Sequence, residues 1–139
     1  MSVKPLFTLI CDDVRVENTN KLIIIGLYGS SINFSVPQVP APAPGTAQTR
    51  PKLALPFLCV VRRWKVDAPG RTAKTEIIDP EGRSQQIAET QLIARDDDYH
   101  QEIIKVAGII LQEGVYTIRT TWDDNGPSVC DEKFRVRIL

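Results

Sequence analysis

The stretch "VYTIRTTW", residues 115–122, changes in character from one residue to the next. Successive side chains of a β-strand point to opposite faces, so one face of such a strand would hold the even-numbered residues Tyr116, Ile118, Thr120 and Trp122. The final stretch "CDEKFRVRIL", residues 130–139, repeats this pattern, with Phe134, Val136 and Ile138 against Lys133, Arg135 and Arg137. The two stretches predict neighbouring strands of an antiparallel sheet with one buried face and one face in water.

Turn signals separate further strands of the same kind. "DDNGPS", residues 123–128, carries Asn-Gly, which favours a tight turn because glycine accepts positive φ, and "DPEGR", residues 79–83, is a second turn. The remaining pattern predicts strands at 102–111, 84–94, 72–78 and 57–66, and two or three more within 6–16 and 21–36. We therefore expect an all-β chain, an immunoglobulin-like antiparallel β-sandwich of about seven to nine strands in one domain.

Gly114 precedes Tyr116 by two residues at the start of the penultimate strand. This spacing resembles the tyrosine corner of immunoglobulin-like sandwiches, where the hydroxyl ties the preceding connection to the strand. Trp64 is the candidate for the central tryptophan of such domains, whereas the cysteine spacing does not fit an antibody-type bridge.

Composition limits the classes of function. A chain of 139 residues with 42% hydrophobic residues is long enough for one core. Seventeen basic and seventeen acidic side chains cancel, so no overall field draws the protein to nucleic acid or to an anionic membrane. The first residues lack the pattern of a signal peptide, and three cysteines, Cys11, Cys59 and Cys130, are widely spaced. We expect reduced thiols in a cytoplasmic protein.

Residues 37–56 hold six of the ten prolines. Proline donates no ladder hydrogen bond, so this segment cannot pair as a central strand and is expected to form a long loop. Long loops in compact domains are often functional. The loop prolines Pro40, Pro42 and Pro44 are therefore candidates for contact with a partner.

The segment "CDDVRVENTNKLIIIGLYGS", residues 11–30, places Cys11 beside Asp12 and Asp13. A cysteine nucleophile needs a base, and the single histidine, His100, lies far away in the sequence. The alternative is a β-bulge at the two aspartates, which would restore the inward phase between Cys11 and Val14. We favour the bulge, followed by a turn at "ENTNK" and a returning strand in which Gly26 marks a bulge or a close-packing point.

The same segment resembles the opening of a family of small uncharacterised bacterial proteins. The matching residues are Cys11, Asp12, Asp13, Lys21, Leu22, Ile25, Gly26, Leu27 and Tyr28. The resemblance covers about a quarter of the chain firmly, and implies an immunoglobulin-like β fold without an assigned activity.

Two acidic loops are expected at one end of the sandwich. They contain Asp96, Asp97, Asp98, Asp123 and Asp124. Clustered carboxylates can hold calcium, although no spacing here matches a defined calcium loop, so these residues are weak metal candidates. Tyr99 and His100 beside them are candidates for a contact surface.

The segment "RRWK", residues 62–65, places cations around an aromatic ring, as in sites that bind a base or a sugar. By parity, however, Arg62 and Trp64 share one face and Arg63 and Lys65 the other. We interpret Trp64 as a core residue with the cations at the edge. No phosphate loop, Cys-x-x-Cys pair or histidine-rich metal spacing occurs in the sequence, so no cofactor is expected.

These observations favour a non-enzymatic interaction module that binds a protein partner or assembles with copies of itself, without nucleic acid or membrane as partners. One alternative is a structural subunit of a bacteriophage or secretion-type assembly. Another is a small carboxylate-based hydrolase or a calcium-dependent carbohydrate binder that uses the acidic end.

Overall fold

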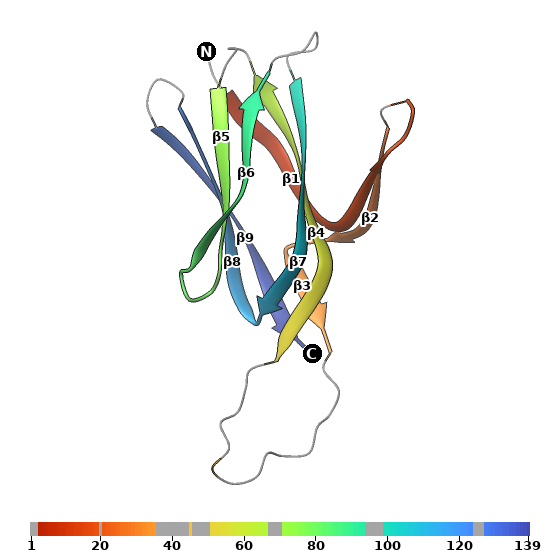
Figure 1. The fold of residues 1–139 in the computed structure, drawn as a ribbon, viewed down its shortest axis with the longest axis vertical. Helices are drawn as coiled ribbons and strands as arrows, with labels where there is room; N and C mark the ends of the chain where they lie inside the picture. Colours follow the sequence, from red (N-terminus) through yellow and green to blue (C-terminus); the bar gives the residue numbers. More distant parts are fainter. Residues whose placement is uncertain are drawn as a thin grey trace.

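The computed structural model describes residues 3–19, 21–35, 45, 51–66, 71–93, 99–123 and 127–139. They form nine strands: β1 (Val3–Val16), β2 (Leu22–Tyr28), β3 (Ser31–Phe34), β4 (Lys52–Val66), β5 (Arg71–Ile78), β6 (Ser84–Leu92), β7 (Tyr99–Gln112), β8 (Gly114–Asp123) and β9 (Pro127–Ile138). Two sheets pack against each other, with the order β2-β1-β4-β7 in one and β3-β9-β8-β5-β6 in the other (Figure 1). The predicted all-β sandwich is confirmed. Within the described ranges, no helix is long and apolar enough to cross a membrane.

The strand order agrees with that of immunoglobulin-type sandwiches. In those domains the A, B and E strands face the G, F and C strands. Here β1, β4 and β7 face β9, β8 and β5 in the same chain order. The arrangement departs from the predicted antiparallel pattern at one place, because β3 pairs with β9 in parallel. The chain passes from the first sheet to the second between β2 and β3, so β3 reaches β9 without a hairpin that would reverse its direction.

The main core fills the space between the sheets near Tyr116. The Tyr116 ring stacks on Phe134 with the centroids 5.2 Å apart. Its hydroxyl oxygen accepts a hydrogen bond from the Gln112 backbone N–H at 2.9 Å. This contact confirms the tyrosine corner, because the hydroxyl ties the end of β7 to the start of β8.

β4 begins at Lys52, five residues before the predicted strand, and the expectation of a loop throughout 37–56 is wrong for residues 52–56. These residues pair with β7, while the pairing of β4 with β1 stops at Cys59. Pro56 therefore lies where β4 has a partner on one side only. Pairing passes from Leu55 to Phe57 without it, so the missing N–H of Pro56 removes no ladder hydrogen bond.

The predicted turn at residues 79–83 is confirmed. The Asp79 carboxylate accepts hydrogen bonds from the backbone N–H groups of Glu81 and Arg83, at 2.9 and 2.8 Å. Gly82 has a φ of 87°, a conformation that glycine adopts without strain. The turn predicted at 123–128 falls largely on residues outside the described part of the chain.

β1 and β2 belong to the first sheet, but the hairpin that they form folds over the outer face of this sheet as a second layer. Figure 1 shows β1 bending away from the sandwich before it meets β2. Beneath the hairpin lies a small apolar cluster of Cys11, Val14, Cys59 and Val61, with Leu9, Leu22, Ile24 and Ile103 packed against it. Cys11 therefore faces away from the main core, which Ile10 enters instead.

The alternation of inward and outward side chains along β1 does change at Asp12 and Asp13, but no extra residue is inserted there. The pairing of β1 with β2 keeps one register from Ile10↔Tyr28 to Val16↔Leu22, so the expected bulge with two residues against one is wrong. The distortion lies instead where Asp12 faces Gly26, whose φ is 65°. A bend at this point turns both Cys11 and Val14 into the same cluster.

Candidate interaction surface

Several of the predicted site residues lie outside the described residues. These are Pro40, Pro42, Pro44, Asp96, Asp97, Asp98 and Asp124. Asp123 is described and is exposed at the end of β8. Among the residues that the structure describes, no group of three or more His, Cys, Asp or Glu side chains could hold a metal ion. The acidic cation site and the proline contacts stay predictions.

Tyr99 and His100 lie at the start of β7 and both are half-buried. The Arg63 guanidinium lies over the Tyr99 ring, 4.4 Å from its centroid. His100 is paired in register with Trp64, and its Nδ1 is buried without a hydrogen-bond partner in the described part of the chain. The two candidates therefore sit on a strand rather than at the tip of a loop, and their role in partner contact stays a prediction.

Cys11 and Cys59 are register partners on neighbouring strands and both are buried free thiols. Burial and the neighbouring Cys59 thiol raise the pKa of Cys11 to about 11. The Cys59 thiol donates to the Asp12 carbonyl oxygen, 3.6 Å away, and burial raises its pKa as well. Both side chains are protonated at neutral pH, and thiols of this kind are poor nucleophiles.

Asp12 joins the two strands of the β1 and β2 hairpin, and Asp13 joins the hairpin to β7. The Tyr28 hydroxyl donates a hydrogen bond to the Asp12 carboxylate, and burial together with this bond raises the pKa of Tyr28 to about 12. Asp13 accepts a hydrogen bond from the Lys105 ammonium at 2.9 Å. This bond holds the pKa of Asp13 below its ordinary value. The hairpin is thus joined to β7 as well as to the cluster beneath it.

β2 is an edge strand with exposed apolar side chains. It lies at the end of the first sheet, and β1 is its only partner among the described strands. Ile23, Ile25 and Leu27 are exposed by 40, 39 and 58%. From Leu22 to Tyr28 the strand contains no charged residue and no proline. It therefore combines an open row of backbone groups with an apolar face in water.

Arg62 is buried in the interior of the sandwich, so the expectation that the cations of residues 62–65 lie at the edge is wrong for this residue. Its guanidinium lies 2.5 Å from Oε1 of Glu102 and also donates to the Thr75 and Thr120 hydroxyls. Trp64, which is fully buried as expected, donates its indole N–H to the same Glu102 oxygen at 3.2 Å. The hydrogen bonds of the Arg62 guanidinium and of Glu102 Oε1 offset part of the cost of burying two charges, whereas Oε2 of Glu102 is buried without a partner among the described residues.

Sequence parity held a signal for this ion pair. Arg62 has the phase of Val60 and Trp64, and Glu102 has the phase of Ile104, all of which face the core. A charged residue in the apolar phase of each of two strands predicts a buried pair once the strands are known to be neighbours. The pairing of β4 with β7 supplies that information.

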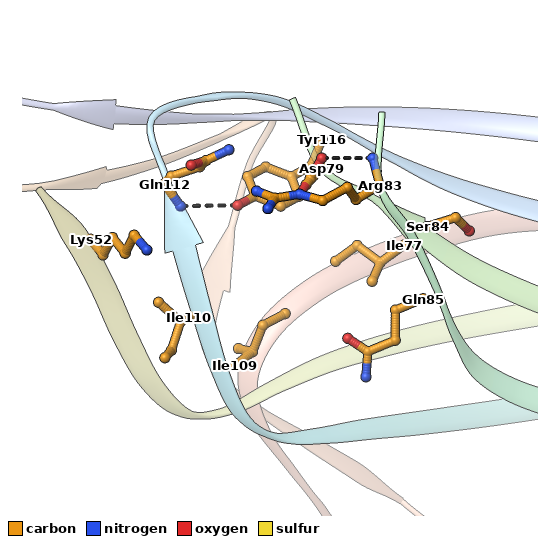
Figure 2. A pocket seen from close by; sticks show the side chains of 10 residues that line it. All are labelled: Lys52, Ile77, Asp79, Arg83, Ser84, Gln85, Ile109, Ile110, Gln112 and Tyr116. Carbon is orange, nitrogen blue, oxygen red and sulfur yellow. Dashed lines mark hydrogen bonds and ion pairs between the residues drawn. The ribbon is translucent and has the colours of Figure 1, made fainter. Parts of the chain in front are cut away.

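A groove of about 410 Å³ lies beside the tyrosine corner (Figure 2). Figure 2 shows the Arg83 guanidinium next to the Tyr116 ring and directed at Asp79. Nε of Arg83 lies 2.7 Å from the Asp79 carboxylate. Although burial raises the pKa of Asp79, its hydrogen bonds with Arg83 and Glu81 lower it overall. The charged pair in this groove therefore closes the turn of residues 79–83 rather than awaiting a ligand.

Comparison with protein-family models, with curated proteins and with solved structures finds no match to this chain.

Proposed function

We propose that this protein is a non-enzymatic interaction module that acts by strand addition at the free edge of β2, and that its partner there is β2 of a second copy. The exposed, uncharged edge formed by Leu22–Tyr28 carries this proposal. Strand addition supplies main-chain hydrogen bonds, and the alternate side chains add apolar contact.

Comparison with the other sheet edges sets β2 apart. Proteins protect their edge strands with charges, prolines, bulges or short length. β6 exposes polar side chains, Gln85, Gln86, Glu89 and Gln91. β7 carries Lys105 and a glycine with positive φ, Gly108, and β3 is only four residues long. β2 has Gly26 as its single irregularity and no charge.

The hydrogen-bonding phase of β2 supports a specific register. The Glu17 N–H donates to the Lys21 carbonyl oxygen at 2.9 Å, which makes 17 and 21 a hydrogen-bonded pair. Such pairs recur at every second residue, so Ile25 bonds to β1 while the backbone N–H and C=O of Ile24 face the free edge. Two copies related by a two-fold axis at Ile24 would exchange both of its bonds.

The same register would pair the exposed side chains. With Ile24 opposite itself, Ile23 of each copy lies opposite Ile25 of the other on the exposed face. Apolar β-branched pairs of this kind stabilise a sheet by roughly 0.2–1 kcal/mol each relative to alanine. An uncharged strand places no like charges opposite each other when it meets its own copy, so the contact is self-complementary.

Charge substitution tests the proposal. Ile25→Lys should weaken self-association at least tenfold in sedimentation equilibrium. Each copy would contribute one lysine to the two-fold interface, so two charges would replace two apolar contacts. Val115→Lys is the matched control, since Val115 is also exposed by 39% but lies on a central strand. Adding Ile23→Glu to Ile25→Lys should restore association by placing opposite charges across the axis. An equal effect of the two single lysine substitutions would overturn the proposal.

All three cysteines are free thiols. Because disulfides form and persist in oxidising compartments, unpaired thiols support the proposal that the protein acts in the cytoplasm.

A further inference from the structure

The outer face of β9 carries three exposed cations in a row, Lys133, Arg135 and Arg137. They line a groove of about 660 Å³ together with Ser30, Ser31, Asn33, Val115 and Phe134. In the part of the chain that the structure describes, none of the three is within ion-pair distance of a carboxylate. This groove is separate from the β2 edge, since it lies on the other sheet.

The groove is hollow because long and short side chains lie next to each other. β3 and β9 are register partners, with Ser31 beside Arg135 and Asn33 beside Arg137. The short serine and asparagine leave space over β3, and the arginines rise at its side. A ligand above β3 would therefore meet a floor of hydroxyl and amide groups and a wall of guanidinium groups.

The charge around the groove is positive. Asp131, the nearest acid on the same face of β9, is bound by Arg119 at 2.8 Å. Glu132 lies on the opposite face of the strand and accepts a hydrogen bond from the Thr8 hydroxyl. Arg135 and Arg137 also line an adjoining depression. Among the described residues, Glu113 is the one carboxylate that lines this depression. Three cations against one nearby acid leave an excess positive charge, which attracts an anionic ligand.

β3 also has an open edge. The Arg135 N–H donates to the Ser30 carbonyl oxygen at 2.9 Å, and the Leu139 N–H to that of Phe34 at 2.8 Å. Even-numbered residues of β3 therefore bond to β9, and the backbone groups of Ser31 and Asn33 face outward. No described residue pairs with that side of β3. Although β3 is too short to attract an uncharged strand by its backbone alone, an extended chain that also contacts the cations of β9 can add here as a short new strand.

We infer that this groove binds an extended acidic polypeptide segment with carboxylates at every second residue. Alternate residues of a strand are about 6.6–6.8 Å apart, both in β9 and in an added strand. The spacing of the carboxylates would therefore match the spacing of Arg135 and Arg137. Arginine suits this task because its planar fork can bind a carboxylate through two hydrogen bonds. Phe134, the aromatic residue of the groove, is buried and offers no ring to a nucleobase, which favours a polypeptide over single-stranded nucleic acid.

A fluorescein-labelled heptapeptide of alternating threonine and glutamate is the probe. Its fluorescence anisotropy should rise on titration with the full chain, and its affinity should fall with added salt. R135Q/R137Q should weaken binding at least tenfold. R15Q/K74Q removes two exposed cations elsewhere and should leave binding unchanged, with circular dichroism and thermal melting confirming that both variants are folded.

A second pair of variants tests strand addition. Asn33→Pro removes the outward N–H without removing a bond to β9, so it should weaken binding, whereas Asn33→Thr should retain it. Equal binding by R135Q/R137Q and R15Q/K74Q would overturn the inference, and so would equal binding by the two Asn33 variants. Tighter binding of an oligothymidine of equal charge would instead assign the groove to nucleic acid and overturn the polypeptide assignment. Ile25→Lys should leave peptide binding intact.

Discussion

Asp12 and Gly26 face each other where the hairpin of β1 and β2 bends, and the Asp12 carboxyl group fills the space that a side chain at position 26 would need. The same carboxylate accepts the Tyr28 hydroxyl. Gly26 therefore allows a partly buried polar contact at the point where the strand changes direction, and this bend sets the position of the β2 edge.

Gly26→Ala should destabilise the protein more than Gly108→Ala. Both glycines have nearly the same φ, 65° and 63°, but an added Cβ meets Asp12 at Gly26 and open space at Gly108. The left-handed conformation alone costs an alanine about 1–2 kcal/mol, and the forced shift of the carboxyl adds about 1–3 kcal/mol at Gly26. Urea unfolding of both variants measures the difference. Equal losses would show that Asp12 moves aside freely.

Lys105→Gln should raise the pKa of Asp13 towards its ordinary value. The hydrogen bond from Lys105 is the largest cause of the lowered pKa, while that from the Val14 N–H remains in the variant. Because the folded pKa is depressed, this contribution to stability is present above the unfolded pKa of about 3.9 and is lost as pH falls through the folded pKa.

The carboxyl chemical shift of Asp13, followed by NMR from neutral to acidic pH, measures this change. Lys74→Gln serves as the control, because Lys74 is exposed on the other sheet. The difference in unfolding free energy between wild type and Lys105→Gln should narrow below about pH 4. An unchanged Asp13 titration in Lys105→Gln would contradict the assignment.

Arg62→Met should be strongly destabilising, because it leaves the Glu102 carboxylate buried without its cation. Breaking one side of a buried ion pair costs about 3–5 kcal/mol. Arg62→Met combined with Glu102→Leu should be more stable than Arg62→Met alone, since no uncompensated charge remains. Chemical unfolding of the three proteins gives both comparisons, and a double variant less stable than the single one would refute the explanation.

The alternating residues of β8 and β9 predicted their own strands, and Gly114 with Tyr116 predicted the tyrosine corner. Local pattern was sufficient there because one face of each strand is wet. It was insufficient where a contact joins distant segments. Pro56 can lie in a strand because β1 does not pair with β4 at this position. The point at which this pairing stops depends on the tertiary structure, not on the local sequence.

The β2 edge and the groove of β9 show the same limit. "LIIIGLY" is apolar at nearly every position, so no alternation indicates which side chains reach water. The cations of β9 were placed correctly on its wet face, but the groove depends on the parallel pairing with β3. That pairing follows from the crossing of the chain between sheets, which residue pattern alone does not encode.

Hydrogen exchange at the Ile24 amide tests the proposed strand addition most directly, because this N–H faces the free edge of β2, where none of the described strands of the same copy pairs with it. Residue-resolved exchange by NMR should be fast in dilute protein and slow markedly as concentration rises, while the amide of Gly29, an exposed residue just beyond β2, should stay fast throughout. Ile25→Lys should abolish this concentration dependence. Rapid exchange of Ile24 at every concentration would contradict the account.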